Sequence, residues 1–325
     1  MPARVNRRTS WQPRSKRRCK ARVRLALPQV QRAPREYGND VAGVVSPGNV
    51  VTTGAVTVDG IRSPLLQAGP PRAREAVVFV HGNPGCSHDW EDLLGRIGEF
   101  GRAVALDMPG FGRADKPADF DYSVQGYARH LHAALIELGV ERAHLVGHDF
   151  GGPWALAWAA QQPSAFASAV LISTGVPVGY RWHALARVWR TRLLGELFMA
   201  TTTRPGFRLL LRRGQAKPLP RPFVDRMYDD FDWGTKRAVL KLYRATDPRM
   251  LNTLVPILCG LDRPALVVWG RRDPYMGVEQ AELQRHSFPS AEIVVLDHCG
   301  HWPFIDDPQR VGDTVIPFLR RQLAA

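Results

Sequence analysis

Six short apolar segments constrain the fold of this chain more than any other feature. Each spans five to seven residues that are nearly all apolar, which is typical of strands covered on both faces of a parallel sheet. The segments are 76–80, 103–107, 144–148, 168–174, 264–270 and 291–297. Helical patterns, such as those at 123–139 and 153–162, lie between them. This alternation predicts an α/β fold, with a mostly parallel sheet and helices on both faces.

One long segment interrupts the alternation. Residues 176–252 are basic and contain no strand pattern, but they place five large apolar residues at helical spacing: Trp182, Leu185, Trp189, Leu193 and Leu197. We therefore expect a core formed by residues 51–175 and 253–325, with an edge strand at 51–60. Residues 176–252 are expected to form an inserted helical lid.

The formal net charge of +14 is unevenly distributed. Residues 1–50 carry 12 Lys or Arg and 2 acidic residues, and residues 176–252 carry 16 and 6, so the remainder of the chain is acidic. The high charge and low apolar content of residues 1–50 predict a disordered extension whose deletion leaves activity intact. A nucleic-acid-binding or targeting arm is the alternative interpretation of this extension. For the core, no nucleic-acid partner is expected.

Several classes of protein are not expected from the composition. No apolar run reaches 18 residues, so no membrane-spanning helix is predicted. The four cysteines form no C-x-x-C pair, which indicates neither a zinc site nor a disulfide framework. We expect a cytoplasmic protein that uses no metal and no organic cofactor.

The stretch VGHDFGG at 146–152 has the pattern of a nucleophile elbow, a sharp turn between a strand and a helix. Such a turn exposes Asp149 at the carboxyl end of the sheet, where open α/β sheets bind ligands. It also directs the backbone N–H of Phe150 to the same point. The N–H of Asn83, in the loop after the first apolar segment, completes a predicted oxyanion hole.

A carboxylate at this position indicates a particular class of reaction. An aspartate is ionised at neutral pH without a base, because its ordinary pKa is about 4. It is a weak nucleophile and needs a reactive sp³ carbon, such as that of an epoxide or a carbon–halogen bond. The resulting alkyl ester on Asp149 must then be hydrolysed by a water molecule that a base activates.

A base and its acidic partner follow two later predicted strands. His301 lies in HCGHWPF and Asp273 lies in GRRDP. The order Asp149, Asp273, His301 is the nucleophile–acid–base order of such sheets. His298 is a competing candidate for the base, and the alternative role of Asp273 is to stabilise a helix N-terminus.

The chain resembles the α/β-hydrolase superfamily from about residue 51 to 323. The resemblance rests on five motifs: HGNPG (81–85), DMPGFGRADKP (107–117), GHDFGG (147–152), WGRRDP (269–274) and CGHWPF (299–304). Within the superfamily, an aspartate nucleophile is similar to that of the epoxide hydrolases and of the haloalkane and haloacetate dehalogenases. The resemblance implies the α/β-hydrolase fold. The apolar lid and Trp302, next to His301, indicate a small hydrophobic substrate, with water as the second reactant.

The epoxide hydrolases place a Tyr-Arg pair late in the lid, and Tyr243-Arg244 resembles it. This implies that Tyr243 donates a proton to the epoxide oxygen as the ring opens; the alternative is that it only packs the lid onto the core. A second lid tyrosine is usual in that branch, and Tyr228 is a candidate by proximity. Tyr180 and Trp302 are placed among the substrate-binding residues.

Haloalkane dehalogenases share the asparagine matched by Asn83, but they place a tryptophan directly after the nucleophile. This chain has Phe150 there, which lacks an N–H donor on its side chain. Haloacetate dehalogenases have an arginine at that position. We therefore predict an epoxide hydrolase-like enzyme, with a haloalkane dehalogenase as the alternative. A non-catalytic ligand-binding protein on the same fold is the second alternative.

Overall fold

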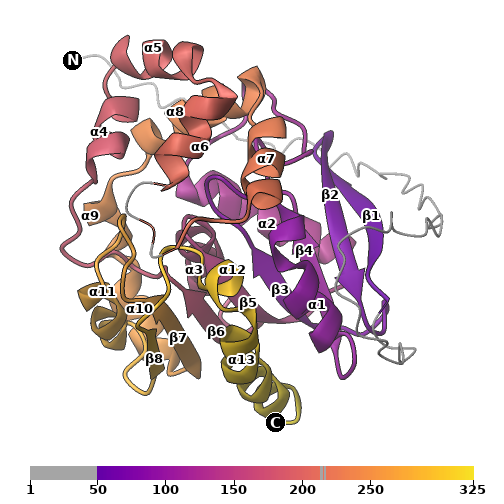
Figure 1. Cartoon of the computed structure of the whole chain (residues 1–325). Helices are drawn as coiled ribbons and strands as arrows, with labels where there is room; N and C mark the ends of the chain where they lie inside the picture. The colour runs from indigo at the N-terminus through magenta and orange to yellow at the C-terminus, as the bar shows by residue number, and fades with distance from the viewer. Residues whose placement is uncertain (1–49, 213–214, 216) are drawn as a thin grey trace, which may run out of the picture. The chain divides into compact units, whose positions relative to one another are not determined.

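An eight-stranded sheet forms the centre of the computed structural model, which describes residues 50–212, 215 and 217–325 (Figure 1). The strand order is β1-β2-β4-β3-β5-β6-β7-β8. Two strands, β1 (Thr52–Val58) and β2 (Ile61–Ala68), pair in antiparallel fashion at one edge. The others pair in parallel: β3 (Glu75–Val80), β4 (Arg102–Leu106), β5 (Arg142–His148), β6 (Phe166–Ile172), β7 (Ala265–Gly270) and β8 (Glu292–Leu296). The predicted α/β fold with a mostly parallel sheet is confirmed.

Burial explains why the inner strands are apolar throughout. Every residue of β4, β6 and β7 is buried, whereas the edge strand β8 is partly exposed along most of its length. Only β2 was not expected from the sequence. Pro64 breaks its pattern, because proline removes a backbone donor. In the structure Pro64 lies within β2, and the pairing of β2 with β4 begins at the next residue, Leu65, and continues to Ala68.

Helices cover both faces of the sheet. On one face α1 (Glu91–Ile97) packs against α13 (Pro308–Leu323), and on the other α3 (Gly151–Gln161) packs against α2 (Val124–Glu137) and α10 (Leu254–Leu261). The Ser123 hydroxyl caps α2 by accepting the N–H of Gly126, as the predicted helix boundary requires. The core also contains four short helical elements: η1 (Ser87–Trp90), α11 (Glu279–Leu283), η2 (Gln284–His286) and α12 (Pro303–Asp306).

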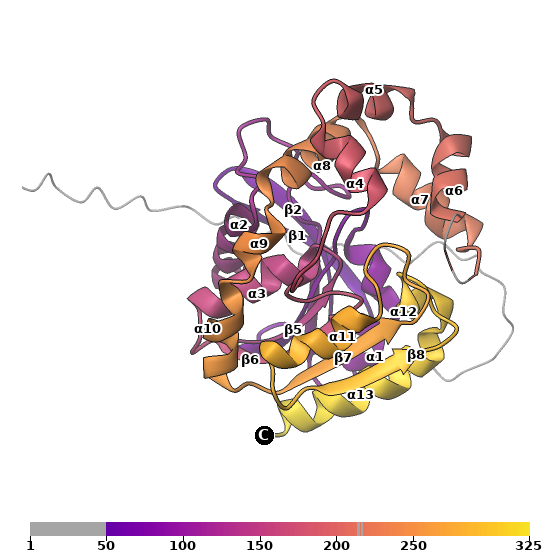
Figure 2. The same ribbon diagram turned by 90° about the vertical axis from the view of Figure 1, so that its left-hand side faces the viewer.

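Among the described residues, the first six of the seven helices between β6 and β7 lie beyond the carboxyl ends of the parallel strands (Figure 2), and we term them the helical segment. They are α4 (Ala184–Arg190), α5 (Leu194–Thr201), α6 (Arg204–Arg212), α7 (Arg221–Asp229), α8 (Trp233–Ala245) and α9 (Pro248–Leu251). The expected single apolar stripe from Trp182 to Leu197 is wrong. A turn separates α4 from α5 and places Leu193 at φ 67° with 83% exposure, so the register of the stripe is lost there.

Charged contacts fasten the helical segment to the core. Arg226 of α7 binds the buried carboxylate of Asp89 at 2.6 Å, and Lys116 binds Asp232 at 2.9 Å. Within the described residues, no helix has both the length and the apolar content needed to cross a bilayer. The extension predicted at residues 1–50 lies outside the described residues, except for Val50.

Candidate active site

Asp149 occupies the tight turn between β5 and α3. Its backbone has φ 50°, a left-handed conformation that is uncommon for a residue with a side chain. The turn packs directly on the end of β3: a Cβ at Gly151 would lie 2.0 Å from the carbonyl oxygen of Val80. The hydroxyl of Thr174 donates to the backbone carbonyl of Asp149 and holds the turn from the other side. Asp149 is therefore presented by a rigid turn at the carboxyl end of the sheet.

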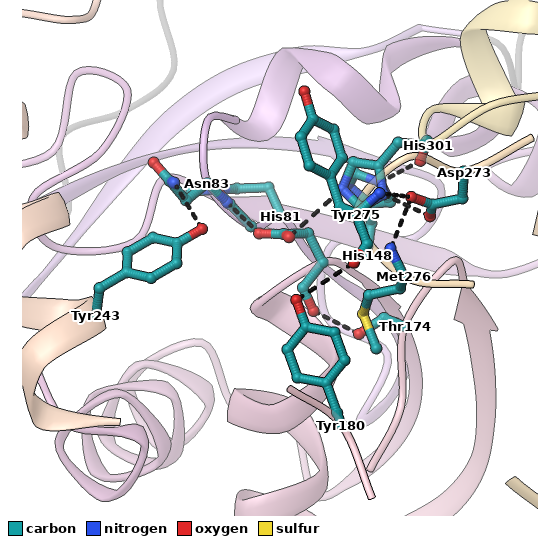
Figure 3. A network of polar contacts seen from close by, with 12 residues as sticks. His81, Asn83, His148, Thr174, Tyr180, Tyr243, Asp273, Tyr275, Met276 and His301 are labelled. Carbon is teal, nitrogen blue, oxygen red and sulfur yellow. Dashed lines mark hydrogen bonds and ion pairs between the residues drawn. The ribbon is translucent and has the colours of Figure 1, made fainter. Parts of the chain in front are cut away.

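His301 and Asp273 approach Asp149 from the loops after β8 and β7 (Figure 3). The Nδ1 atom of His301 lies 2.7 Å from Oδ2 of Asp273, and its Nε2 atom lies 3.4 Å from Oδ2 of Asp149. The other oxygen of Asp273 accepts the N–H groups of Tyr275 and Met276, so this carboxylate is fixed in place. His298, the competing candidate for the base, has an exposed side chain.

A second buried histidine supports the backbone of His301. Burial lowers the pKa of His148 to about 3, so its ring is neutral. Its Nε2–H donates to the carbonyl oxygen of His301 at 2.7 Å, and the two rings lie 4.6 Å apart. His148 thus positions the loop that carries His301.

The charge states follow from this arrangement. Burial alone would raise the pKa of Asp149, but the hydrogen bond and charge of His301 outweigh it and leave the pKa below its ordinary value. Burial alone would lower the pKa of His301, but the charges of Asp273 and Asp149 raise it to about 10. At neutral pH the site therefore holds an imidazolium between two carboxylates, and Asp149 is ionised.

The loop after β3 supplies a hydrogen-bond donor to Asp149. The backbone N–H of Asn83 donates to Oδ1 of Asp149 at 2.7 Å. The loop fits closely, because a Cβ at Gly82 would lie 2.4 Å from Oδ1 of Asp149 and 2.6 Å from the backbone nitrogen of Phe150. The side chain of His81 holds this loop by accepting the N–H of Met108 and donating to the carbonyl of Gly82. Of the two predicted oxyanion donors, Asn83 thus binds the Asp149 carboxylate, and the backbone nitrogen of Phe150 lies against the same loop at Gly82.

Tyr243 of α8 reaches the site from the helical segment. Its hydroxyl accepts the side-chain N–H of Asn83 at 3.5 Å (Figure 3). Its ring packs against Phe150, Trp182 and Trp189. Burial and the neighbouring charge of Asp149 raise the pKa of Tyr243 well above its ordinary value. The phenol therefore keeps its proton throughout the physiological pH range.

The other predicted substrate-binding residues lie in different places. Tyr180 donates its hydroxyl to the carbonyl of Tyr275, and Trp302 is buried beside His301. Both line a cavity that reaches Asp149. Tyr228, the candidate for a second lid donor, bonds instead to the carbonyl of Thr202 and lines neither cavity.

Sequence reasoning missed His183, which precedes α4. Its Nδ1 accepts the N–H of Ala186 at 3.2 Å, and burial lowers its pKa to about 4. The ring is therefore neutral, with its proton on Nε2. His183 lies 6.3 Å from Tyr243 and 5.2 Å from Tyr275, measured between ring centroids. The only signal in the sequence is a histidine at a helix start, which is not specific.

Two cavities meet at Asp149. The first, termed the α6 cavity, contains about 560 Å³ of empty space that is partly open to solvent. Its lining from the helical segment is mainly Leu185, Trp189, Phe198, Phe207, Leu210 and Leu211. The second, termed the α9 cavity, contains about 470 Å³ and is lined by Phe150, Pro153, Pro177, Trp182, Pro248, Leu251 and Met276. Four residues line both: Asp149, His183, Tyr243 and Tyr275.

Comparison with known proteins agrees with this geometry at the level of the family. Residues 75–308 match the family described as alpha/beta hydrolase fold. This chain belongs to that family. The match covers the strands and loops that carry Asn83, Asp149, Asp273 and His301.

Relatives within the family have diverse activities. A 2-hydroxymuconate semialdehyde hydrolase of Pseudomonas sp. strain CF600 is 28% identical over 82% of this chain and 93% of its own length. A cis-3-alkyl-4-alkyloxetan-2-one decarboxylase of Xanthomonas campestris is 26% identical over 81% and 93%. The solved structure of the epoxide hydrolase CorEH has a TM-score of 0.72 over 84% of this chain and 99% of that chain, at 17% identity, which is a likeness of fold.

Proposed function

We propose that this protein is a hydrolase that opens an epoxide to a diol through a covalent ester on Asp149, and that the helical segment is the lid of its substrate site. The observation that carries the proposal is the environment of the Asp149 carboxylate. One oxygen accepts the N–H of Asn83 at 2.7 Å, the other faces His301 at 3.4 Å, and the protonated phenol of Tyr243 lines the same cavity.

In the first step, Oδ2 of Asp149 attacks one carbon of the epoxide ring. Oδ1 is held by the N–H of Asn83, which leaves Oδ2 as the attacking atom. The carbon–oxygen bond of the ring breaks, and the departing oxygen takes the proton of Tyr243. The neutral ring of His183, with its proton on Nε2, is a second donor at the same point. The product is a 2-hydroxyalkyl ester, and Tyr243 recovers its proton from solvent.

In the second step, water hydrolyses this ester. Esterification removes the negative charge of Asp149, so His301 keeps only Asp273 as an anionic partner and its pKa falls. The imidazolium then loses its proton to solvent, and the neutral imidazole takes a proton from water, which attacks the ester carbonyl carbon. His301 later passes this proton to the alkoxide that leaves. The negative charge develops on Oδ1, where the N–H groups of Asn83 and Phe150 stabilise it. Collapse of the intermediate releases the diol and restores the carboxylate.

A single turnover in ¹⁸O-labelled water tests the covalent route. The new hydroxyl oxygen of the diol comes from Asp149 in this mechanism, whereas the water oxygen enters the carboxylate. We expect unlabelled diol from the first turnover and one ¹⁸O atom in the peptide that contains Asp149, both measured by mass spectrometry. Labelled diol together with an unlabelled peptide would mean that water attacks the epoxide directly.

The two steps should differ in their dependence on pH. Ring opening needs ionised Asp149, whose pKa lies below its usual value, and protonated Tyr243, whose pKa lies well above 10. We therefore expect kcat/KM to be flat from about pH 5 to 9. Ester hydrolysis needs neutral His301, so the single-turnover rate of ester decay should rise with pH. Its apparent pKa should fall between about 6.5 and the value of about 10 in the free protein.

The pH dependence also separates two roles of His301. If His301 had to be neutral for the first step, kcat/KM would fall as the pH drops below about 10, because the free site holds the imidazolium. A flat profile therefore supports attack by Asp149 without a base, and a sloping one contradicts it.

A haloalkane dehalogenase is the second candidate, and one observation favours it. Trp182 lines the α9 cavity, and its buried indole N–H has no hydrogen-bond partner among the described residues. An unpartnered N–H there is a donor for a departing halide, a role that the side chain of Phe150 cannot fill. Release of bromide from 1-bromohexane, measured against release of diol from 1,2-epoxyhexane, distinguishes the two activities.

A further inference from the structure

We infer that the preferred substrates are internal epoxides, with an apolar group on each ring carbon and one group in each cavity. This inference rests on the proposed function and specifies its substrate class. The starting observation is that Asp149 lies at the junction of the α6 and α9 cavities and lines both.

Side chains that form hydrogen bonds lie at this junction. Of the four residues that line both cavities, Asp149 is the nucleophile, and His183, Tyr243 and Tyr275 carry N–H or O–H groups. Burial raises the pKa of Tyr275 to about 12, so its hydroxyl also stays protonated. A polar, reactive group is therefore best accommodated between the two cavities and not at the far end of one.

Away from the junction both cavities are predominantly apolar. The α6 cavity is enclosed by side chains of α4, α5 and α6, and the α9 cavity by α3, α9 and the loop after β6. In Figure 2, α6 and α9 lie on opposite sides of the helical segment. Two apolar cavities that extend in different directions from Asp149 match an epoxide with an apolar group on each ring carbon. These two groups are termed the arms of the substrate.

The linings also specify the charge of the arms. Among the described residues, neither lining includes a lysine or an arginine. The buried imidazolium of His301 is already paired with Asp273 and Asp149. A carboxylate or phosphate at the end of an arm would therefore be desolvated without a cationic partner, which is unfavourable. The arms are neutral.

The test compares 1,2-epoxyhexane, which carries one butyl group, with 5,6-epoxydecane, which carries a butyl group on each ring carbon. Burial of one CH₂ is worth about fourfold, so a second butyl group that enters a preformed cavity should raise kcat/KM by about tenfold or more. This gain should occur although the second group hinders attack at its carbon. Equal or lower kcat/KM for 5,6-epoxydecane would overturn the inference.

Variants that fill one cavity give a sharper test. Leu210 and Leu251 line the α6 and α9 cavities, and neither contacts the reacting atoms in the proposed mechanism. Leu210→Trp and Leu251→Trp should each lower kcat/KM for 5,6-epoxydecane by about tenfold or more, because one butyl group loses its cavity. Each should lower kcat/KM for 1,2-epoxyhexane clearly less than for 5,6-epoxydecane, since its single butyl group can use the other cavity. The double variant should lose both activities.

The chain offers matched controls for these variants. Leu209 and Met250, the preceding neighbours of the two residues, are 53% and 65% exposed and line neither cavity. Leu209→Trp and Met250→Trp should leave both substrates unaffected. Thermal unfolding checks that each variant folds, and Leu251→Phe is the smaller replacement for the buried Leu251.

The outcomes separate this inference from the proposed function. If 1,2-epoxyhexane is converted to its diol but 5,6-epoxydecane is not, the two-arm inference is wrong and the epoxide hydrolase function stands. Equal loss of both substrates in a folded Leu251→Trp variant would also contradict the two-arm inference. If neither epoxide yields a diol or an adduct on Asp149, the proposed function itself fails.

Discussion

A His301→Gln variant mixed with 1,2-epoxyhexane should accumulate one ester on Asp149 and release almost no diol. The variant retains the nucleophile and the N–H of Asn83, so ring opening proceeds. It lacks the base that activates water, and removal of a general base typically slows a step by about 10²–10⁴. The loss of the imidazolium also allows burial to raise the pKa of Asp149, so the experiment is best performed near pH 8.

Intact-protein mass spectrometry distinguishes the candidate functions. Addition of an epoxide adds the full mass of the epoxide, because no group leaves. With 1-bromohexane the adduct adds the mass of the substrate less HBr, and one equivalent of bromide is released. A ligand-binding protein without catalysis gives no adduct with either reagent. Peptide mapping then locates the modification.

Two control variants make this result specific. Asp149→Asn should give no adduct, because an amide is not a nucleophile towards an epoxide. His298→Gln, which changes an exposed histidine three residues before His301, should turn over like the unchanged protein. An adduct in the Asp149→Asn variant would place the reactive group elsewhere and refute the role given to Asp149.

Tyr243→Phe should lower kcat/KM for epoxides by about 10²–10⁴, the usual contribution of general acid catalysis. The phenylalanine ring keeps the packing against Phe150, Trp182 and Trp189, so we expect little loss of stability. The loss should appear in the rate of adduct formation and not in the rate of ester hydrolysis. Rapid mixing followed by acid quench and mass spectrometry measures the two rates separately.

The matched control is Tyr228→Phe. Tyr228 lies in the same helical segment, but its hydroxyl bonds to the carbonyl of Thr202 and lines neither cavity. Its removal should leave kcat/KM unchanged. An equal effect of the two substitutions would indicate that Tyr243 acts by packing. If Tyr243→Phe spares ring opening while the double variant with His183→Ala abolishes it, His183 is the principal proton donor.

Local patterns in the sequence account for the parts that were predicted correctly. A buried strand or an elbow depends on a few consecutive residues, and the order of Asp149, Asp273 and His301 depends on which strand each follows. The proximity of these three residues could be predicted because parallel strands bring their carboxyl ends to one edge of the sheet. The prediction of one apolar stripe across Leu193 was wrong because helical spacing alone does not reveal a turn that interrupts the helix and changes its register.

The sequence by itself determined the α/β architecture and the residues that the loops bring towards Asp149. The tertiary structure alone decided that the charges of Asp273 and Asp149 raise the pKa of His301, that His183 and Tyr275 lie with Tyr243 beside Asp149, and that two apolar cavities meet there. Those properties depend on distances and burial among residues that are far apart in the chain; Asp273, for example, lies 28 residues from His301. No local pattern encodes them, because electrostatic and packing energies are set by the folded surroundings of each side chain.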